Sequence, residues 1–174
     1  MTASRRDKTM ENLKGLKLGA MRRMYDEVLD RNLKGRKGPE EFLGELLDQE
    51  MAARKVSALN NRMLKAKLPQ VKDLDVFKFE EASVDESSVR RLYDGDFMKE
   101  RKNIVFMGGS GTGKTHLAIS IGVNLIRQGC KVRFWNMVDL VNELEREKEQ
   151  NKTGALQRRM KGFSLVILDE LGYL

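Results

Sequence analysis

Eight consecutive residues near the middle of the chain have the types and spacing needed to hold a phosphate. The run GGSGTGKT fits the pattern G-x-x-x-x-G-K-[ST]. Glycines allow backbone conformations in which consecutive N–H groups converge on phosphate oxygens, and the lysine adds a positive charge for the β- and γ-phosphates. The threonine hydroxyl suits Mg²⁺. The predicted nucleotide-binding residues are Gly108, Gly109, Ser110, Gly111, Thr112, Gly113, Lys114 and Thr115, with Thr115 also a predicted metal ligand.

The only histidine follows this loop directly. His116 falls in the first turn of the predicted next helix, where it lies either beside the nucleotide or over the loop as a packing residue. The packing role is the simpler interpretation, and His116 remains a candidate cofactor-binding residue.

Two adjacent carboxylates near the end of the chain are the second candidate for chemistry. Asp169 and Glu170 follow the apolar run LVIL, which predicts a buried strand. Ligands of parallel α/β sheets bind outside the carboxyl ends of the strands, so Asp169 is expected at the same edge as the phosphate loop. We predict that Asp169 helps to hold magnesium and that Glu170 polarises the attacking water, with Lys114 as a further catalytic residue.

The elements around these motifs alternate between strand and helix. Apolar runs predict strands over 103–109, 131–136 and 164–170, and helical patterns lie over 115–129 and 137–150, the latter opened by Asn136 and Asp139 as a capping pair. A short helix is expected around 86–93. Strands that are apolar on both faces and alternate with helices predict a parallel sheet covered on each side, an α/β fold of the P-loop NTPase type.

The first part of the chain predicts helices only. Apolar spacing indicates one helix over 10–33, broken near Gly19, and a second that begins at Pro39 and ends at Leu68-Pro69. The second helix is expected to pack on the first through the stripe Phe42, Leu43, Leu46, Leu47 and Met51. The predicted organisation is a small all-α basic domain over 1–68, an extended linker over 69–85 and a nucleotide-binding α/β part over 86–174.

The net charge of +7 is placed unevenly. Residues 1–67 carry 16 Lys and Arg against 10 Asp and Glu, whereas residues 68–174 carry 17 against 16. A basic excess favours a polyanionic partner such as double-stranded DNA, although many solvated helices are equally basic. The candidate DNA contacts are Arg54, Lys55, Arg62, Lys65 and Lys67, with Arg158, Arg159 and Lys161 as a weaker second group.

Composition excludes several other classes of protein. No apolar run approaches the roughly 20 residues that span a bilayer, and the basic start of the chain lacks the apolar core of a secretory signal. A single cysteine, Cys130, excludes an internal disulfide. We therefore expect a cytoplasmic protein with no membrane partner.

Two stretches resemble a known family. GKTHLA and LDELGYL, within the longer run from Asn103 to Leu144 and the last ten residues, are similar to the IstB-like transposition helper ATPases, AAA+ proteins related to the DnaC-type helicase loaders. The resemblance implies that ATP and Mg²⁺ are the cofactors and that the protein forms homo-oligomers and binds DNA beside the transposase of its insertion sequence. By residue, it implies that Gly108–Thr115 form the nucleotide loop, Asp169 the magnesium-associated aspartate and Glu170 the catalytic glutamate.

The resemblance also implies what the sequence lacks. Family members continue for about half a domain, with a sensor, an arginine that acts on a neighbour's ATP, and the strand that lies between those over 103–109 and 164–170. We therefore expect a truncated product or an interrupted gene, with weak turnover or none. Two alternatives remain open: a helicase loader with the same ATP chemistry, and a catalytically inactive DNA-binding fragment.

Overall fold

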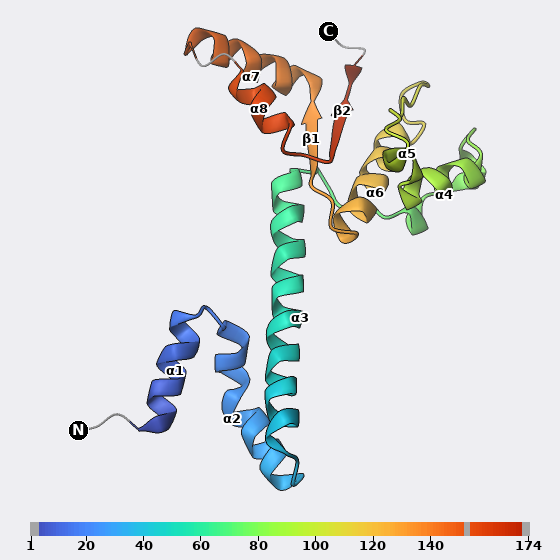
Figure 1. Cartoon of the computed structure of the whole chain (residues 1–174). Coiled ribbons are helices and arrows are strands. Elements are labelled where there is room, and N and C mark those ends of the chain that lie inside the picture. The colour runs from blue at the N-terminus through green and yellow to red at the C-terminus, as the bar shows by residue number, and fades with distance from the viewer. Residues whose placement is uncertain (1–3, 152–153, 172–174) are drawn as a thin grey trace. The chain divides into compact units, whose positions relative to one another are not determined.

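The structure is a computed structural model that describes residues 4–151 and 154–171. It divides into two compact units, Met1–Ala58 and Leu59–Leu174, each described here by itself. The long helix α3 (Pro39–Ala66) contributes its first part to unit 1 and its last part to unit 2 (Figure 1).

Unit 1 is built from helices alone. Helix α1 (Arg5–Gly15) begins with a capping box between Ser4 and Asp7, α2 (Gly19–Lys34) follows, and Pro39 occupies the first position of α3. The predicted break near Gly19 is confirmed, because the backbone between α1 and α2 turns with Lys17 at φ 58°. The single helix expected over 10–33 is therefore two helices.

The core of unit 1 uses only part of the stripe predicted on α3. Leu46 is buried with Leu13, Met21 and Val28, and Phe42 packs against this cluster. The prediction is wrong for the three other stripe residues, which are exposed: Leu43, Leu47 and Met51. Each of these lies one position after a residue of the row 42, 46 and 50 that faces the core or is buried, and one position along an α-helix turns a side chain by 100° away from it.

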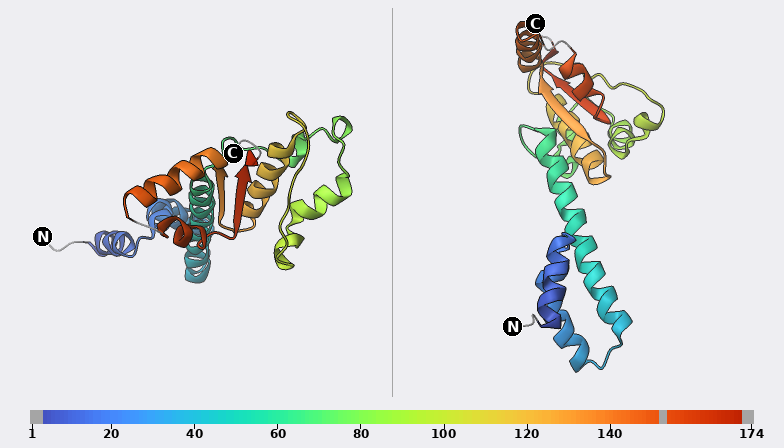
Figure 2. Two further views of the ribbon diagram at one scale, coloured as in Figure 1. Left: turned by 90° about the horizontal axis from the view of Figure 1, so that it is seen from above. Right: turned by 60° about the vertical axis from the view of Figure 1, so that its left-hand side comes forward.

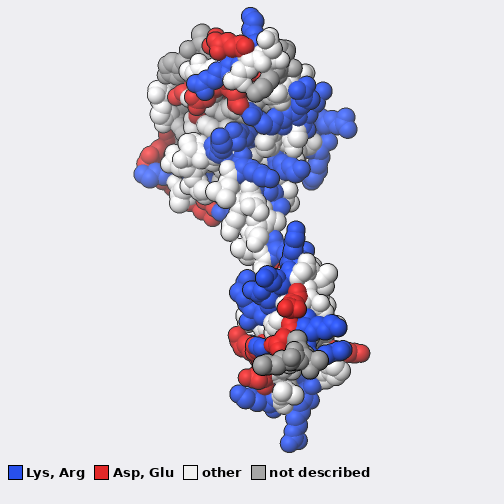
Figure 3. Space-filling model, turned by 90° about the vertical axis from the view of Figure 1, so that its left-hand side faces the viewer, with Lys and Arg blue, Asp and Glu red and all other residues white. Residues whose placement is uncertain are grey.

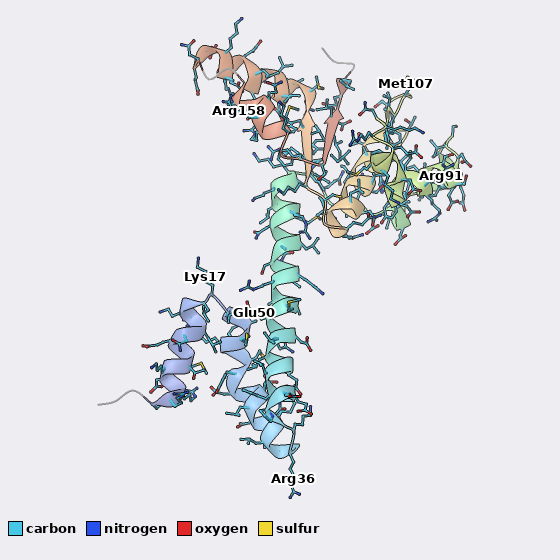
Figure 4. The ribbon with its side chains drawn as sticks, viewed as in Figure 1. Lys17, Arg36, Glu50, Arg91, Met107 and Arg158 are labelled. Atoms are coloured by element: carbon cyan, nitrogen blue, oxygen red, sulfur yellow. The ribbon has the colours of Figure 1, made fainter. Side chains whose placement is uncertain are left out.

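A buried carboxylate ties α3 to the start of α2. Glu50 accepts hydrogen bonds from the backbone N–H groups of Ala20 (2.8 Å) and Met21 (3.2 Å), and it forms an ion pair with Arg54 at 2.8 Å (Figure 4). The N–H groups at a helix start have no partners within the helix, and a negative charge there also interacts favourably with the helix dipole. Glu50 thus supplies the cap that the apolar Leu18 cannot.

In unit 2, the segment that follows the last part of α3 packs against helices of the unit. The region predicted as an extended linker contains two short 3₁₀ turns, η1 (Leu74–Val76) and η2 (Phe79–Glu81). Leu74 is buried with Val89 and Leu117, so this segment lies against helices of unit 2. Helices α4 (Glu86–Asp94) and α5 (Asp96–Lys99) follow, and α4 confirms the short helix predicted at 86–93.

The rest of unit 2, within the described residues, consists of a two-stranded parallel sheet and three helices. In chain order these are α6 (Lys114–Arg127), β1 (Val132–Asn136), α7 (Met137–Glu149), α8 (Ala155–Met160) and β2 (Leu165–Asp169). Strands β1 and β2 pair in parallel, with Val132 opposite Leu165 and Asn136 opposite Asp169. The parallel α/β prediction is confirmed at this level, and the register brings the carboxyl ends of both strands to one edge (Figure 1).

Alternating residues of the two strands enter two different clusters. Val132 and Ile167 pack with Ile121 and Leu125 of α6 and with the last turns of α3. Trp135 and Val166 pack with residues of α7 and α8. Both views of Figure 2 keep β1 and β2 side by side. The alternation follows the period of two along a strand, so α6 and the pair α7 and α8 anchor opposite faces of the sheet.

The strand predicted over 103–109 does not form. Ile104 and Phe106 pack on the α6 core, whereas Val105 and Met107 are exposed, which is the alternation of an extended segment. A strand also needs a partner for its backbone hydrogen bonds. No strand of the described residues lies beside 103–107, and a cavity of about 620 Å³ separates this segment from β2.

Among the residues that the structure covers, no helix combines the length and the apolar character required to cross a bilayer.

The Glu50 cap predicts a pH-dependent stability for unit 1. The hydrogen bond from Arg54, together with those from the two α2 amides, lowers the pKa of Glu50 below its usual value. The stabilisation is therefore full above the unfolded-state pKa, about 4.3, and is lost as the pH falls through the lowered folded-state pKa. Glu50→Gln should destabilise α2 at pH 7, seen as faster amide exchange of Ala20 and Met21.

The control is Glu11→Gln, which removes an exposed carboxylate from the same unit. The difference between wild type and Glu50→Gln should shrink as the pH is lowered from about 5 to about 2. An equal exchange rate for wild type and Glu50→Gln at pH 7 would contradict the proposed cap.

Candidate nucleotide site

The phosphate loop lies where an extended segment turns into a helix. Residues 108–113 connect the segment over 103–107 to α6, which begins at Lys114. Three glycines of the loop have positive φ: Gly108 (155°), Gly111 (76°) and Gly113 (85°). Residues with side chains rarely adopt these angles. The loop therefore needs glycine for its backbone path, as the motif predicts.

Gly113 is fixed by a neighbour as well as by its backbone. A Cβ atom at this position would lie 2.6 Å from the ring of Phe77, which comes from the segment that packs over the loop. This close approach leaves no room for a side chain between the start of α6 and Phe77.

Lys114 folds back over its own loop. Its Nζ donates to the carbonyl oxygens of Gly108 (2.9 Å) and Gly109 (2.5 Å) and lies 3.4 Å from the Thr112 hydroxyl. The ammonium group is thus held by oxygen atoms of the loop itself, and Lys114 is the first residue of α6. Such a helix start is suited to a phosphate.

A hydrogen bond joins the Asp169–Glu170 pair to the helix that follows the phosphate loop. The Thr115 hydroxyl lies 3.1 and 3.0 Å from the two carboxylate oxygens of Asp169 and donates its hydrogen to this carboxylate, and both residues are half-buried. Thr115 is in the first turn of α6, and Asp169 is the last residue of β2. The structure brings together two residues that are 54 positions apart in the chain.

Glu170 is held by a residue that the sequence assigned only to capping. Asn136 accepts a hydrogen bond from the Val138 N–H at the start of α7 and donates one from Nδ2 to the Glu170 carboxylate. Glu170 itself adopts φ 62°. The sequence did hold a signal for this pair, since Asn136 ends a strand whose carboxyl end reaches the same sheet edge as Asp169.

His116 contacts the segment before the sheet. Its Nε2 lies 2.9 Å from the Asp73 carbonyl oxygen, to which it donates, and its ring meets that of Phe77 edge to face. Asp73 also forms an ion pair with Arg127 at 2.6 Å, and this hydrogen-bonded partner lowers the pKa of Asp73. These contacts join the 69–85 segment to both ends of α6.

The cavity beside β2 extends to this site. Its lining includes Gly108, Lys114, Thr115, Asp169 and Glu170 at the polar end. The apolar end lies between the segment over 104–107, whose exposed Met107 is labelled in Figure 4, and the strand residues 165–168. The cavity therefore joins the loop, the two carboxylates and the unpaired edge of β2.

The predicted DNA contacts divide between the two units. Arg54 and Lys55 belong to unit 1, where Arg54 is engaged by Glu50 and by the Lys17 carbonyl oxygen. Arg62, Lys65 and Lys67 belong to unit 2. Basic side chains are spread over both units in the face drawn in Figure 3. The Arg54 side chain is thus already engaged within unit 1, and a ligand would have to compete with these contacts.

Sequence reasoning missed one arginine of unit 2. Arg133 on β1 donates from Nη1 to the Lys65 carbonyl oxygen at 3.0 Å, and its guanidinium lies 4.8 Å from the centre of the Trp135 ring. Arg159 lies 5.9 Å from the same ring and forms an ion pair with Glu143. Burial, and then the nearby charge of Arg159, lower the pKa of Arg133. Arg133 was not a predicted site residue, because its apolar neighbours predicted only a strand at this position.

The fold and the site define a class: an α/β nucleotide-binding protein with a phosphate loop at the start of a helix and an aspartate at the end of a neighbouring parallel strand. The family model described as IstB-like ATP binding protein matches residues 11–174. The chain belongs to this family.

Curated relatives support the same assignment. The chain is 39% identical over 138 residues to the ATP-binding protein of insertion sequence IS5376 from Geobacillus stearothermophilus, covering 77% of this chain and 54% of the relative. It is 31% identical over 164 residues to that of IS232 from Bacillus thuringiensis (94% and 66%), and 32% identical over 163 residues to that of IS21 from Pseudomonas aeruginosa (93% and 62%). The chain thus spans between about half and two thirds of the length of these relatives.

Proposed function

We propose that this chain binds ATP with Mg²⁺ at the phosphate loop and acts as a DNA-binding helper of an insertion-sequence transposase. The observation that carries the nucleotide part is the contact between Thr115 and Asp169. It joins the two phosphate-handling motifs at one sheet edge, where an α/β sheet binds its ligand.

The residues present fit a magnesium ion bound together with phosphate. Thr115 and Asp169 offer the hydroxyl and carboxylate oxygens that Mg²⁺ prefers. The described residues contain no group of three or more His, Cys, Asp or Glu that could hold a metal without further ligands, so phosphate and water oxygens must complete the shell. Bound Mg²⁺ would neutralise charge on the β- and γ-phosphates. Lys114 would exchange the Gly108 and Gly109 carbonyl oxygens for phosphate oxygens.

Glu170 is the proposed base that orients the attacking water. Its carboxylate accepts a hydrogen bond from Asn136, which occupies one of the positions a water would need. Hydrolysis then requires this bond to open. Asn136 is the proposed restraint on Glu170, and the α7 start that it caps is the element through which a partner could move it.

The contact between Asn136 and Glu170 also suggests a second candidate function. With Glu170 held by Asn136 and Lys114 engaged by its own loop, the chain is arranged to bind ATP without turning it over. In that case ATP is a structural ligand, and the chain has a DNA-binding or subunit-capping role.

The proposed polyanion surface lies in unit 2. Arg62 and Lys65 are one turn apart on α3, and Arg133 contacts the Lys65 carbonyl oxygen with Arg159 beside it. The Nε groups of Arg62 and Arg133 are buried and have no hydrogen-bond partner among the residues that the structure describes, and Glu143 is the acidic residue paired with Arg159. Double-stranded DNA supplies closely spaced phosphates, which suit such a cluster of cations.

We also propose a transposase and its target DNA as the partners of this chain. The names of the relatives associate them with insertion sequences, which supports a transposase as the protein partner and target DNA as the ligand. We further propose that ATP promotes homo-oligomers on that DNA, in the cytoplasm. Co-purification with a replicative helicase, without stimulation of a transposase, would instead support the helicase-loader alternative.

The Asn136 contact predicts a gain of activity on mutation. Asn136→Ser keeps a side chain that can cap α7 but is too short to reach Glu170. Because one hydrogen bond is worth about 1 kcal/mol, ATP turnover should rise about fivefold. Glu170→Gln should lower turnover at least about 100-fold. Single-turnover hydrolysis of radiolabelled ATP measures the rates of both variants. The control is Lys114→Ala, which should not bind ATP.

If wild type, Asn136→Ser and Glu170→Gln all bind ATP and none turns it over, the hydrolysis proposal fails. The structural-ligand function would then be the better account.

The polyanion surface predicts a change in salt dependence. Arg62→Gln with Lys65→Gln should weaken duplex DNA binding uniformly across sequences and reduce the slope of log affinity against log salt by about 2, since each lost phosphate contact is worth about 0.9. The matched control is Arg90→Gln with Lys99→Gln, two cations of the same unit that already have carboxylate partners. Equal slopes for the two variants would exclude the proposed surface.

A further inference from the structure

Asp73 makes polar contacts with three different elements of unit 2. One carboxylate oxygen, Oδ1, accepts hydrogen bonds from the Tyr93 hydroxyl at 3.1 Å and from the Leu74 N–H at 3.0 Å. The other, Oδ2, forms the ion pair with Arg127 at 2.6 Å, and the backbone carbonyl oxygen accepts from His116 at 2.9 Å. Asp73 therefore links the start of η1 to α4 and to both ends of α6.

The charge states of these groups suit the contacts that they make. The hydrogen bond from Arg127 lowers the pKa of Asp73, so the carboxylate is ionised at neutral pH. Burial, and then the hydrogen bond to Asp73, raise the pKa of Tyr93, so its hydroxyl keeps the proton that it donates. The side chain of Asp73 is 29% exposed, which leaves the ion pair partly shielded from solvent.

The segment that Asp73 holds reaches the phosphate loop through Phe77. The Phe77 ring meets the His116 ring edge to face, with 5.2 Å between the ring centroids. The same ring closes on Gly113, where an added Cβ atom would lie 2.6 Å from it. Gly113 is the last residue before α6 and has φ 85°. Phe77 and His116 thus form a contact between the Asp73 segment and the turn in which the loop becomes a helix.

We propose that Asp73 is a positioning residue of the nucleotide site, which acts through Phe77 and His116 to order the phosphate loop before a ligand binds. This inference rests on the nucleotide function proposed above. The loop offers backbone N–H groups to phosphate, so its affinity depends on a backbone that is already ordered. A loop that has to become ordered on binding loses conformational entropy and binds more weakly.

The proposed role makes the segment over 69–85 part of the nucleotide site. It also predicts which ligands are affected, because Asp73 acts on the loop that holds the phosphates. ATP and inorganic tripolyphosphate should therefore lose affinity by the same factor when the Asp73 contacts are broken. A role in stability alone would lower the melting temperature and leave both affinities unchanged at a temperature where the variants are folded.

The ion pair between Asp73 and Arg127 provides the test. Asp73→Asn keeps the shape of the side chain but can turn an NH₂ group toward the Arg127 guanidinium, so that two donors face each other. Isothermal titration with Mg²⁺ present should show about tenfold weaker binding of ATP and of tripolyphosphate, as expected for the loss of a charged hydrogen bond. Arg127→Gln should behave in the same way, whereas Arg127→Lys keeps the cation and should retain most of the affinity.

The matched control is Asp85→Ala. Asp85 is also an acidic residue of the segment over 69–85, but its hydrogen bonds to Ser87 and Ser88 lie at the start of α4. Loss of this helix cap lowers stability without removing a contact of the loop. Without any ligand, amide exchange at Gly113 and Lys114 should be faster in Asp73→Asn than in wild type and in Asp85→Ala.

Three results would overturn the positioning role. These are wild-type affinity in Asp73→Asn, equal losses of affinity in Asp73→Asn and Asp85→Ala, and a loss for ATP that tripolyphosphate does not share. Each of them leaves the proposed nucleotide function standing, because wild type still binds ATP. A wild type that binds neither ligand would contradict the nucleotide function and this inference together.

Discussion

The hydrogen bond from the Thr115 hydroxyl to the Asp169 carboxylate is the interaction on which the account of this protein depends. It links the first turn of α6 to the last residue of β2, which are far apart in sequence. Without it, the phosphate loop and the carboxylate pair would be two separate motifs. With it, the lysine, the hydroxyl and the aspartate line the polar end of one cavity. The nucleotide proposal therefore depends on how firmly α6 and β2 are held together.

The packing of unit 2 provides that support. Ile121 and Leu125 of α6 are buried against Val132 and Ile167 of the two strands, and alternate strand residues are anchored from the other side by α7 and α8. A Cβ atom at Gly122 would lie 2.8 Å from the Ile167 side chain, so helix and strand approach closely at this point. Parallel pairing then fixes Asn136 opposite Asp169 at the sheet edge. The side chains of the nucleotide site are thus positioned by apolar contacts outside the site.

Much of this arrangement could be predicted from the sequence, and the exceptions have physical causes. The loop, its helix and the strand ending at Asp169 follow from local pattern, because glycine spacing and apolar periodicity act on neighbouring residues. The strand over 103–109 could not be decided locally, since it depends on a partner strand. The exposure of Leu43, Leu47 and Met51 depends on how wide a contact α3 makes. Asn136 and Arg133 were missed because their partners, Glu170 and Lys65, are 34 and 68 residues away.

We propose that Thr115 and Asp169 act together on a magnesium–nucleotide ligand. Isothermal titration of ATP into wild type, Asp169→Asn and Thr115→Val, each with Mg²⁺ and with excess chelator, tests it most directly. We expect Mg²⁺ to tighten ATP binding in wild type by at least about tenfold, or about 1.4 kcal/mol. Each variant should lose most of this gain while keeping its affinity without metal. An unchanged Mg²⁺ effect in both variants would contradict the account.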